Sequence, residues 1–197
     1  MHPRRGWPFL AVPHHPVLSA LWELVAHGTL GLLVVLPLVW RSERRARNAA
    51  LAFAGGVVLD VDHAIAAGSL DPRRMELLGN RPVTHSLLFA GLLALAALAI
   101  ARRPPLAWAV LAVLLAHLLF DAPGGGVPLL YPLRHAEALP WLACPLGIAA
   151  LTGVSELVAR RYCQTRTQST VIAAGSGVVA SGGPGQSPPT ATSRISE

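Results

Sequence analysis

The stretch AALAFAGGVVLDVDHAIAAG, residues 49–68, places three ionisable side chains in a run that is otherwise apolar. These side chains belong to Asp60, Asp62 and His63. Burying a charge is costly, and the cost is higher in a membrane, where a lone ionisable group finds few partners. Other residues of the chain, or a bound ion, must therefore hold these three groups.

The composition of the chain favours a helical membrane protein. Of the 197 residues, 53% are hydrophobic and 13% are charged, whereas soluble domains contain about 25% charged residues. The net charge of +6 comes from arginine, because the chain contains no lysine. The arginines cluster between apolar runs, which is typical of membrane-flanking charge. No nucleic-acid-binding motif accompanies them, so we expect no nucleic-acid partner.

Five apolar runs reach or approach the roughly 20 residues that a membrane-spanning helix needs. This pattern predicts an all-α, polytopic membrane helix bundle with five spans, or four if the first or last run lies at the interface. The runs cover residues 17–40, 48–67, 84–101, 106–121 and 140–158. We expect a membrane-embedded domain over residues 17–160, a proline-rich irregular segment over 1–16, and a disordered tail rich in Ser, Thr, Gly and Pro over 161–197.

Polar residues of the apolar runs gather at one end of the predicted bundle. Asp60 and His63 lie three residues apart near the end of the second run, and His85 opens the third. His117 and Asp121 close the fourth run, four residues apart and therefore on one helix face. Where spans alternate in direction, the second run ends, the third begins and the fourth ends on the same side. The three motifs should therefore converge.

A metal site is the interpretation that explains this convergence. Histidines and carboxylates at helical spacing on several helices form the metal sites of helix bundles. Mixed nitrogen and oxygen ligands suit zinc, manganese or iron, and we expect zinc first, with one or two ions. Taken singly, each side chain also fits a simpler role, as a hydrogen-bonded core histidine or a helix-end aspartate. The ligands that we predict are Asp60, His85, His117 and Asp121, with His27 as the next candidate if the first helix begins late.

Three further residues are candidates for catalysis and substrate binding. Of Asp62 and His63, one could be an additional ligand while the other acts as a general base or orients a ligand. Arg81 lies beside the predicted site and could hold an anionic group of a substrate. Anchoring of the chain at the membrane surface is an equal alternative for this arginine. The loop at 121–134, DAPGGGVPLLYPLR, could form one wall of the site or serve only as a connector.

Taken in order, these motifs resemble the YdjM family of LexA-regulated, inner-membrane, metal-dependent hydrolases. The resemblance covers residues 25–160 and implies an inner-membrane enzyme. Asn80 and Pro82 stand where the family has histidine and glycine, and Leu59 stands where it has proline, so Asn80 could lower the number of metals or alter the activity. The matching segments are His27-Gly28, LDVDH at 59–63, NRPVTHSLL at 80–88, His117 to Asp121, and GVPLLYP at 126–132.

The function that these features predict is metal-assisted hydrolysis at a membrane face. Such an enzyme would use Asp62 and His63 in catalysis and would cleave an ester or phosphodiester bond of an amphiphilic small molecule, with membrane lipids as partners. Two alternatives stay open. The His and Asp residues could line an ion or proton path in a small transporter, or a metal could only hold the bundle together. Ligands gathered at one end favour hydrolysis, and ligands staggered across the bilayer favour a path.

Overall fold

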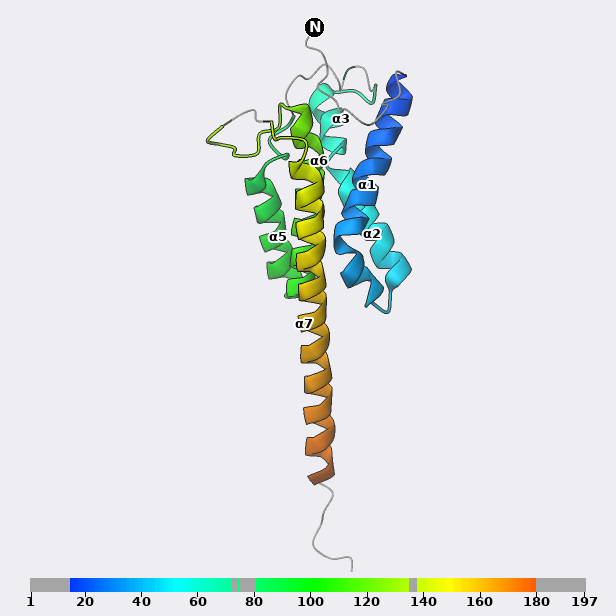
Figure 1. The fold of residues 1–197 in the computed structure, drawn as a ribbon, viewed down its shortest axis with the longest axis vertical. Helices are drawn as coiled ribbons and strands as arrows, with labels where there is room; N and C mark the ends of the chain where they lie inside the picture. The colour runs from blue at the N-terminus through cyan, green and yellow to red at the C-terminus, as the bar shows by residue number, and fades with distance from the viewer. Residues whose placement is uncertain (1–14, 72–73, 75–80, 135–137, 180–197) are drawn as a thin grey trace, which may run out of the picture. The chain divides into compact units, whose positions relative to one another are not determined.

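The protein is all-α, as the sequence predicts. A computed structural model describes residues 15–71, 74, 81–134 and 138–179, and these residues form helices and loops without a strand. The helices are α1 (Pro16–Trp40), α2 (Arg45–Val58), α3 (Val61–Ala67), α5 (Leu87–Ala101), α6 (Pro104–Asp121) and α7 (Ala143–Val179), with a 3-10 turn, η1 (Ala122–Gly124), after α6 (Figure 1).

Four helical segments of the described chain are long and apolar enough to cross a membrane. They cover Val17–Trp40, Arg45–Ala67, Pro104–Gly124 and Ala143–Thr165. The third predicted run instead forms α5, a helix of only 15 residues. It is short because Ser86 caps its start, accepting a hydrogen bond from the Phe89 backbone N–H, and Arg102 ends it in a left-handed conformation with φ 51°.

The second apolar run forms two helices. α2 ends at Val58 and α3 begins at Val61. At the junction, the backbone N–H groups of Asp60 and Asp62 donate to the carbonyls of Val57 and Leu59, three residues back rather than four. This tighter turn leaves Asp60 between the two helices.

The chain divides into two structural units at Arg160. In the first unit, α6 lies at the centre and packs against α1, α2 and α5. The α7 segment up to Arg160 joins the same core through Cys144, Ile148 and Leu151, and Trp108 Nε1 donates to Ser155 Oγ at 2.8 Å. The buried apolar side chains of α6 are Ala112, Val113, Leu114, Ala116 and Leu118.

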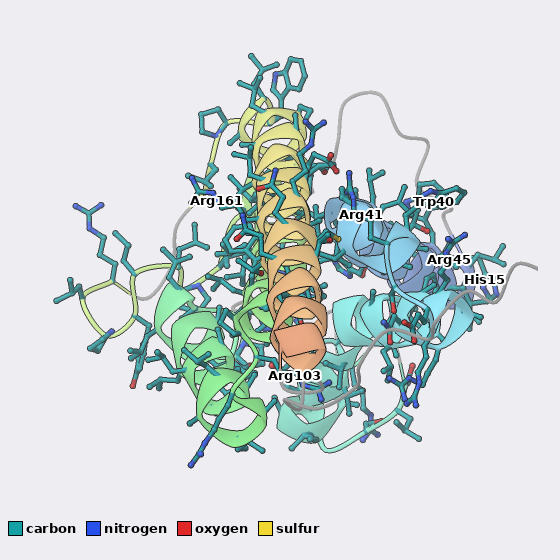
Figure 2. All side chains as sticks on the ribbon, turned by 90° about the horizontal axis from the view of Figure 1, so that it is seen from below. His15, Trp40, Arg41, Arg45, Arg103 and Arg161 are labelled. Atoms are coloured by element: carbon teal, nitrogen blue, oxygen red, sulfur yellow. The ribbon has the colours of Figure 1, made fainter. Side chains whose placement is uncertain are left out.

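Helix direction alternates along the first unit and fixes where the turns lie. α1 and α5 run toward the turns at residues 41–44 and 102–103, and α2 and α6 run back from them (Figure 1). Figure 2 shows this end of the bundle, with Trp40, Arg41, Arg45 and Arg103 around it. The Arg45 guanidinium lies over the Trp40 ring, 5.2 Å from its centroid. The ends of α2 and α6 and the start of α5 therefore lie on the same, opposite side of the bundle.

The second unit departs from the predicted disordered tail. α7 continues as a helix to Val179, so residues 161–179 are helical. The Thr165 and Thr167 hydroxyls donate to backbone carbonyls three or four residues earlier, which satisfies them without breaking the helix. The Gly, Ser and Pro residues that dominate the composition of the tail are concentrated after residue 179. Residues 180–197, like residues 1–14 of the irregular segment predicted over 1–16, lie outside the described residues, and Pro16 of that segment begins α1.

Candidate metal centre

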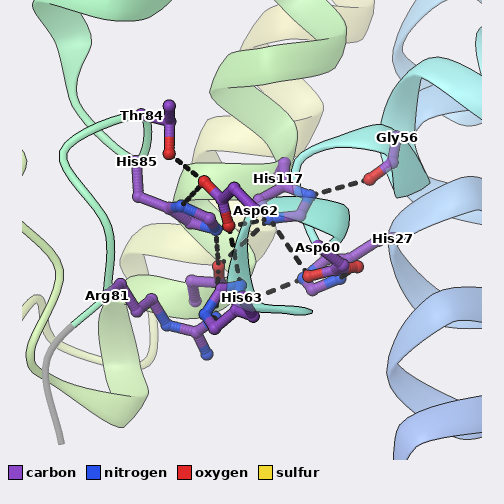
Figure 3. Close-up of polar contacts among 10 residues, drawn as sticks. His27, Gly56, Asp60, Asp62, His63, Arg81, Thr84, His85 and His117 are labelled. Carbon is purple, nitrogen blue, oxygen red and sulfur yellow. Dashed lines mark hydrogen bonds and ion pairs between the residues drawn. The ribbon is translucent and has the colours of Figure 1, made fainter. Parts of the chain in front are cut away.

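Every residue that the sequence predicted for the site lies in one cluster (Figure 3). Four segments supply it: α1, the α2–α3 junction with α3, the segment before α5, and the end of α6. Three overlapping groups of these side chains have ligand atoms within 4.8 Å of one another. The groups are His27, His117 and Asp121; Asp60, His85 and His117; and Asp62, His63 and His85.

His27 reaches the cluster by a route that the sequence did not predict. α1 does not begin late, because it starts at Pro16 and places His27 near its middle. The cluster lies at this level because α6 ends there, α5 begins there and the α2–α3 junction falls there. Gly56 permits the close approach of α1 to α2, since a Cβ at this position would lie 2.3 Å from the His27 carbonyl oxygen.

Two carboxylates hold the His27 ring. Its Nδ1 lies 2.9 Å from Asp60 Oδ2, and its Nε2 lies 3.1 Å from Asp121 Oδ1. The ring also stacks on that of His117, with 3.8 Å between centroids. His27 is 1% exposed and Asp121 3% exposed, so these ionisable groups sit away from water and each requires a partner.

The His117 ring is oriented by a backbone carbonyl. Its Nδ1 donates to the Gly56 oxygen at 2.7 Å, which leaves Nε2 of a neutral ring with a free lone pair. That lone pair faces other acceptors: Asp121 Oδ2 at 3.2 Å, and Asp60 Oδ1 at 3.7 Å. A histidine that donates one ring N–H to a carbonyl while the other nitrogen faces carboxylates is the arrangement that metal sites use.

The His85 ring also faces the acceptors around His117 Nε2. Its Nε2 lies 3.1 Å from His117 Nε2 and 3.5 Å from Asp121 Oδ2, while its Nδ1 lies 3.3 Å from Asp62 Oδ2. If neutral His85 donates from Nδ1 to Asp62, its Nε2 lone pair faces that of His117. If it donates from Nε2, its Nδ1 lone pair faces a carboxylate. Burial lowers the pKa of His85 and so disfavours the doubly protonated ring. A cation at Nε2 removes this conflict.

Unpartnered atoms support the same interpretation. Within the described chain, Asp121 Oδ2 and His85 Nδ1 are buried and make no hydrogen bond of good geometry. Such atoms are rare in folded proteins unless an ion or water meets them. The possible ligand atoms of the cluster are imidazole nitrogens and carboxylate oxygens, which fit zinc, manganese or iron. The residues present therefore suit a divalent cation.

Asp62 and His63 form a pair at the edge of the cluster. Asp62 Oδ2 accepts a hydrogen bond from Thr84 Oγ1 and contacts His85, and Asp62 Oδ1 lies 3.0 Å from His63 Nδ1. Both side chains are partly exposed, 18% for Asp62 and 15% for His63. His63 Nε2 points toward Arg81, whose Nη1 is 3.4 Å away. Asp62 is thus placed to orient two histidines, and His63 Nε2 lies beside Arg81 at the accessible side.

Arg81 lies at the open side of the cluster. Its Nη1 is 2.9 Å from Asp121 Oδ2, and its side chain is 24% exposed. The loop at 121–134 holds this segment, because the Arg81 N–H donates to the Gly126 carbonyl and the Leu87 N–H to the Leu129 carbonyl, both at 3.0 Å. Asn80, one of the three positions that depart from the resembling family, lies outside the described residues.

Two functional contacts were missed by the sequence analysis. They are the Gly56 carbonyl, which orients His117, and the Thr84 hydroxyl, which donates to Asp62. A signal for each was available. Paired glycines in an apolar helix mark close backbone approach, and a threonine directly before a ligand histidine is placed to bond a neighbouring carboxylate.

Comparison with known proteins identifies a family for this chain. The family model of the YdjM inner membrane protein matches residues 23–182. No curated protein and no solved structure is significantly similar to the chain. The match includes every residue of the cluster, from His27 to Asp121.

Proposed function

The chain belongs to the YdjM inner membrane protein family, and we propose that it is an inner-membrane, metal-dependent hydrolase. The observation that carries this proposal is the convergence of the His85 and His117 Nε2 atoms with Asp121 Oδ2 in a buried cluster whose one fixed cation among the described residues is Arg81, 2.9 Å from that oxygen. Four apolar helices long enough to span a bilayer support the membrane placement.

Five residues would hold the metal. His85, His117 and Asp121 form the centre, and Asp60 and His27 complete it from the α2–α3 junction and α1. Zinc is the ion we expect, with manganese or iron as alternatives and one or two ions in the site. A divalent ion in such a site supplies an activated water and polarises the bond to be cleaved.

The residues at the accessible side would transfer a proton and bind the substrate. The His63 ring, held through Nδ1 by Asp62, presents Nε2 to accept a proton from the attacking water or to give one to the leaving group. Arg81 would bind an anionic oxygen of the substrate through its planar guanidinium. Because the scissile group would then lie between two cationic partners, a phosphodiester fits better than a neutral ester. Asp62 is a positioning residue for both His63 and His85.

The level of the site supports an amphiphilic substrate. α6 ends with Asp121 and α5 begins just after His85, so the cluster lies where two apolar helices reach the surface of the bundle. The ligands share one level and are not staggered along the helices, which disfavours an ion path across the bilayer. A metal that only stabilised the fold would have a closed shell, whereas Asp62, His63 and Arg81 are partly exposed.

Elemental mass spectrometry of the detergent-purified protein tests the proposal. We expect close to stoichiometric metal in the unaltered protein and none in the Asp60→Ala/His117→Ala double variant. Glu156→Gln, which alters an ion pair remote from the cluster, is the control and should retain the metal. Hydrolysis is then measured by mass spectrometry of products from phospholipids in mixed micelles. Absence of metal from the unaltered protein, with all variants equally folded, would contradict the proposal.

A further inference from the structure

An apolar groove lies between α1 and the first part of α7, with α6 as its floor. Its volume is about 770 Å³. One stripe of α1, formed by Leu30, Leu33 and Pro37, lines one side. The other side is a stripe of α7 that starts at the metal-centre end. It consists of Cys144, Pro145, Ile148, Ala149, Thr152, Gly153 and Glu156.

Small side chains on α7 create this groove. Gly153 has no neighbour within 4 Å of the position that a Cβ would take. Thr152, a polar residue of the lining, donates its hydroxyl to the Ile148 carbonyl of its own helix at 2.8 Å. The wall therefore offers apolar surface without a free polar group at this point. A ligand that fits it is a hydrocarbon.

The groove begins at the metal centre. Phe120 forms its floor and directly precedes Asp121, and the Phe120 ring meets the His27 ring edge-on, with 4.9 Å between centroids. Leu30 lies one helical turn beyond His27 on α1. A molecule lying in the groove therefore has one end beside the buried cluster.

An ion pair lies at the far end of the groove. Glu156 accepts from Arg41 Nη1 and Nη2, both at 2.6 Å, which ties α7 to the end of α1. From Cys144 to Glu156 the helix rises about 18 Å at 1.5 Å per residue. One leaflet of a bilayer has a hydrocarbon depth of about 15 Å, half of the full core. The groove thus has the length of one acyl chain.

We propose that this groove binds one hydrocarbon chain of the amphiphile whose polar head lies at the metal centre. The proposal rests on the proposed hydrolase function for the role of the head group, but binding of the chain requires neither metal nor turnover. It assigns the substrate to the class of lipids with a long single chain next to the scissile group. Recognition then combines Arg81 at the head with the α1–α7 groove at the tail.

Photocrosslinking in vesicles tests the proposal. The full-length protein is reconstituted with phosphatidylglycerol and phosphatidylethanolamine that include a phospholipid with a diazirine on one acyl chain, and crosslinked peptides are mapped by mass spectrometry. We expect at least fivefold more crosslinks on the groove residues of α1 and α7 than on exposed residues of α5 such as Leu95 and Ile100, which are 63% and 85% exposed. Metal removal by a chelator should not change this ratio.

A matched pair of variants separates the groove from general lipid contact. Gly153→Leu, where an added Cβ meets nothing within 4 Å, places a side chain in the groove lining and should reduce the groove crosslinks at least fivefold, with those of α5 unchanged. Gly91→Leu on α5, where an added Cβ also meets nothing within 4 Å, should leave both unchanged. Equal crosslinking of groove and α5, or no effect of Gly153→Leu, would overturn the proposal. So would protein–protein crosslinks from the groove, which would indicate a second copy as occupant. Crosslinking as expected without hydrolysis would reject only the proposed enzyme activity.

Discussion

Two ionic clusters lie in the first unit of this protein, and they differ in how their charges are satisfied. In the remote cluster, Glu156 meets Arg41 through two parallel contacts and Arg160 Nε through a third, all at 2.6 Å. Each carboxylate oxygen therefore faces a donor. This cluster needs nothing further, and its role is to join α1 to α7.

The buried cluster has the opposite balance. Three aspartates and four histidines of the described chain meet one fixed cation, Arg81, and no tautomer of neutral His85 supplies a donor to both His117 Nε2 and Asp62 Oδ2. A buried group without a partner costs far more than an exposed one. Polar side chains in an apolar bundle do not by themselves indicate a bound ligand. A buried acceptor that lacks a donor does.

Removing a central ligand of the buried cluster should have the largest effect on metal binding. In Asp121→Ala, the oxygen that faces both His85 and His117 is lost, so we expect metal affinity to fall at least about a hundredfold. Affinity is measured by competition with a chromogenic chelator in detergent. The corresponding change in the remote cluster, Glu156→Ala, should leave affinity unchanged. Equal losses in the two variants would show that the buried cluster has no special role.

Replacing His63 should separate chemistry from metal binding. We expect His63→Ala to keep its metal content and to lose about 10²–10⁴-fold in turnover of a phosphodiester lipid, since His63 Nε2 lies at the accessible side beside Arg81, where it could exchange a proton with the substrate. Product formation and metal content are measured on the same preparation. Loss of the metal together with turnover would instead make His63 a ligand.

Much of this site could be predicted from the sequence, and the reason is physical. Helix lengths and alternating direction alone bring LDVDH, His85 and the His117–Asp121 pair to one level, so their convergence required no tertiary detail. The position of the site along the helices did depend on tertiary contacts. The turn at Leu59 and Asp60 and the Gly56 contact set where α2 breaks and how closely it approaches α1, and neither follows from hydrophobic periodicity.

The positioning contacts were harder to predict than the ligands. The paired glycines at 55–56 mark a close helix approach, but they do not say that the Gly56 carbonyl accepts from His117, because every residue has a carbonyl. The start of α5 was predicted three residues too early, at residue 84, because it depends on the Ser86 cap, whereas its end at Ala101 matches the predicted run. Composition likewise placed the end of α7 too early, because it averages over a segment whose first part is helical.

Asp62 offers a sharper test of the difference between ligand and positioning residue. Asp62→Asn keeps the shape but weakens the hold on His85, so we expect metal affinity to fall about 10–100-fold, less than for Asp121→Ala. Thr84→Val removes only the hydroxyl that donates to Asp62 and should produce a smaller loss in the same direction. Chelator competition measures both. An unchanged affinity in Asp62→Asn would assign Asp62 to catalysis alone.

The close approach of α1 and α2 should matter for stability as well as for the site. In Gly56→Ala the new methyl group would meet the His27 backbone, so we expect a loss of about 1–3 kcal/mol in unfolding free energy. Tryptophan fluorescence during denaturation in detergent reports this loss. Gly91→Ala, in open space on α5, should be neutral or slightly stabilising. Similar destabilisation by both would mean that the contact at Gly56 relaxes without cost.

The smallest effect should come from the satisfied cluster. Glu156→Gln keeps the size of the side chain but removes its charge, and exposed ion pairs contribute little to stability. We expect the midpoint of thermal unfolding to fall by about 1–2 °C, a shift typical of a weak surface interaction, and metal content to stay constant. Raising the salt concentration should lower the midpoint of the unaltered protein more than that of the variant, because salt screens only the pair that is present. A large loss of stability, or any loss of metal, would show that this ion pair supports the buried cluster, and the contrast between satisfied and unsatisfied charge would no longer separate structure from function in this bundle.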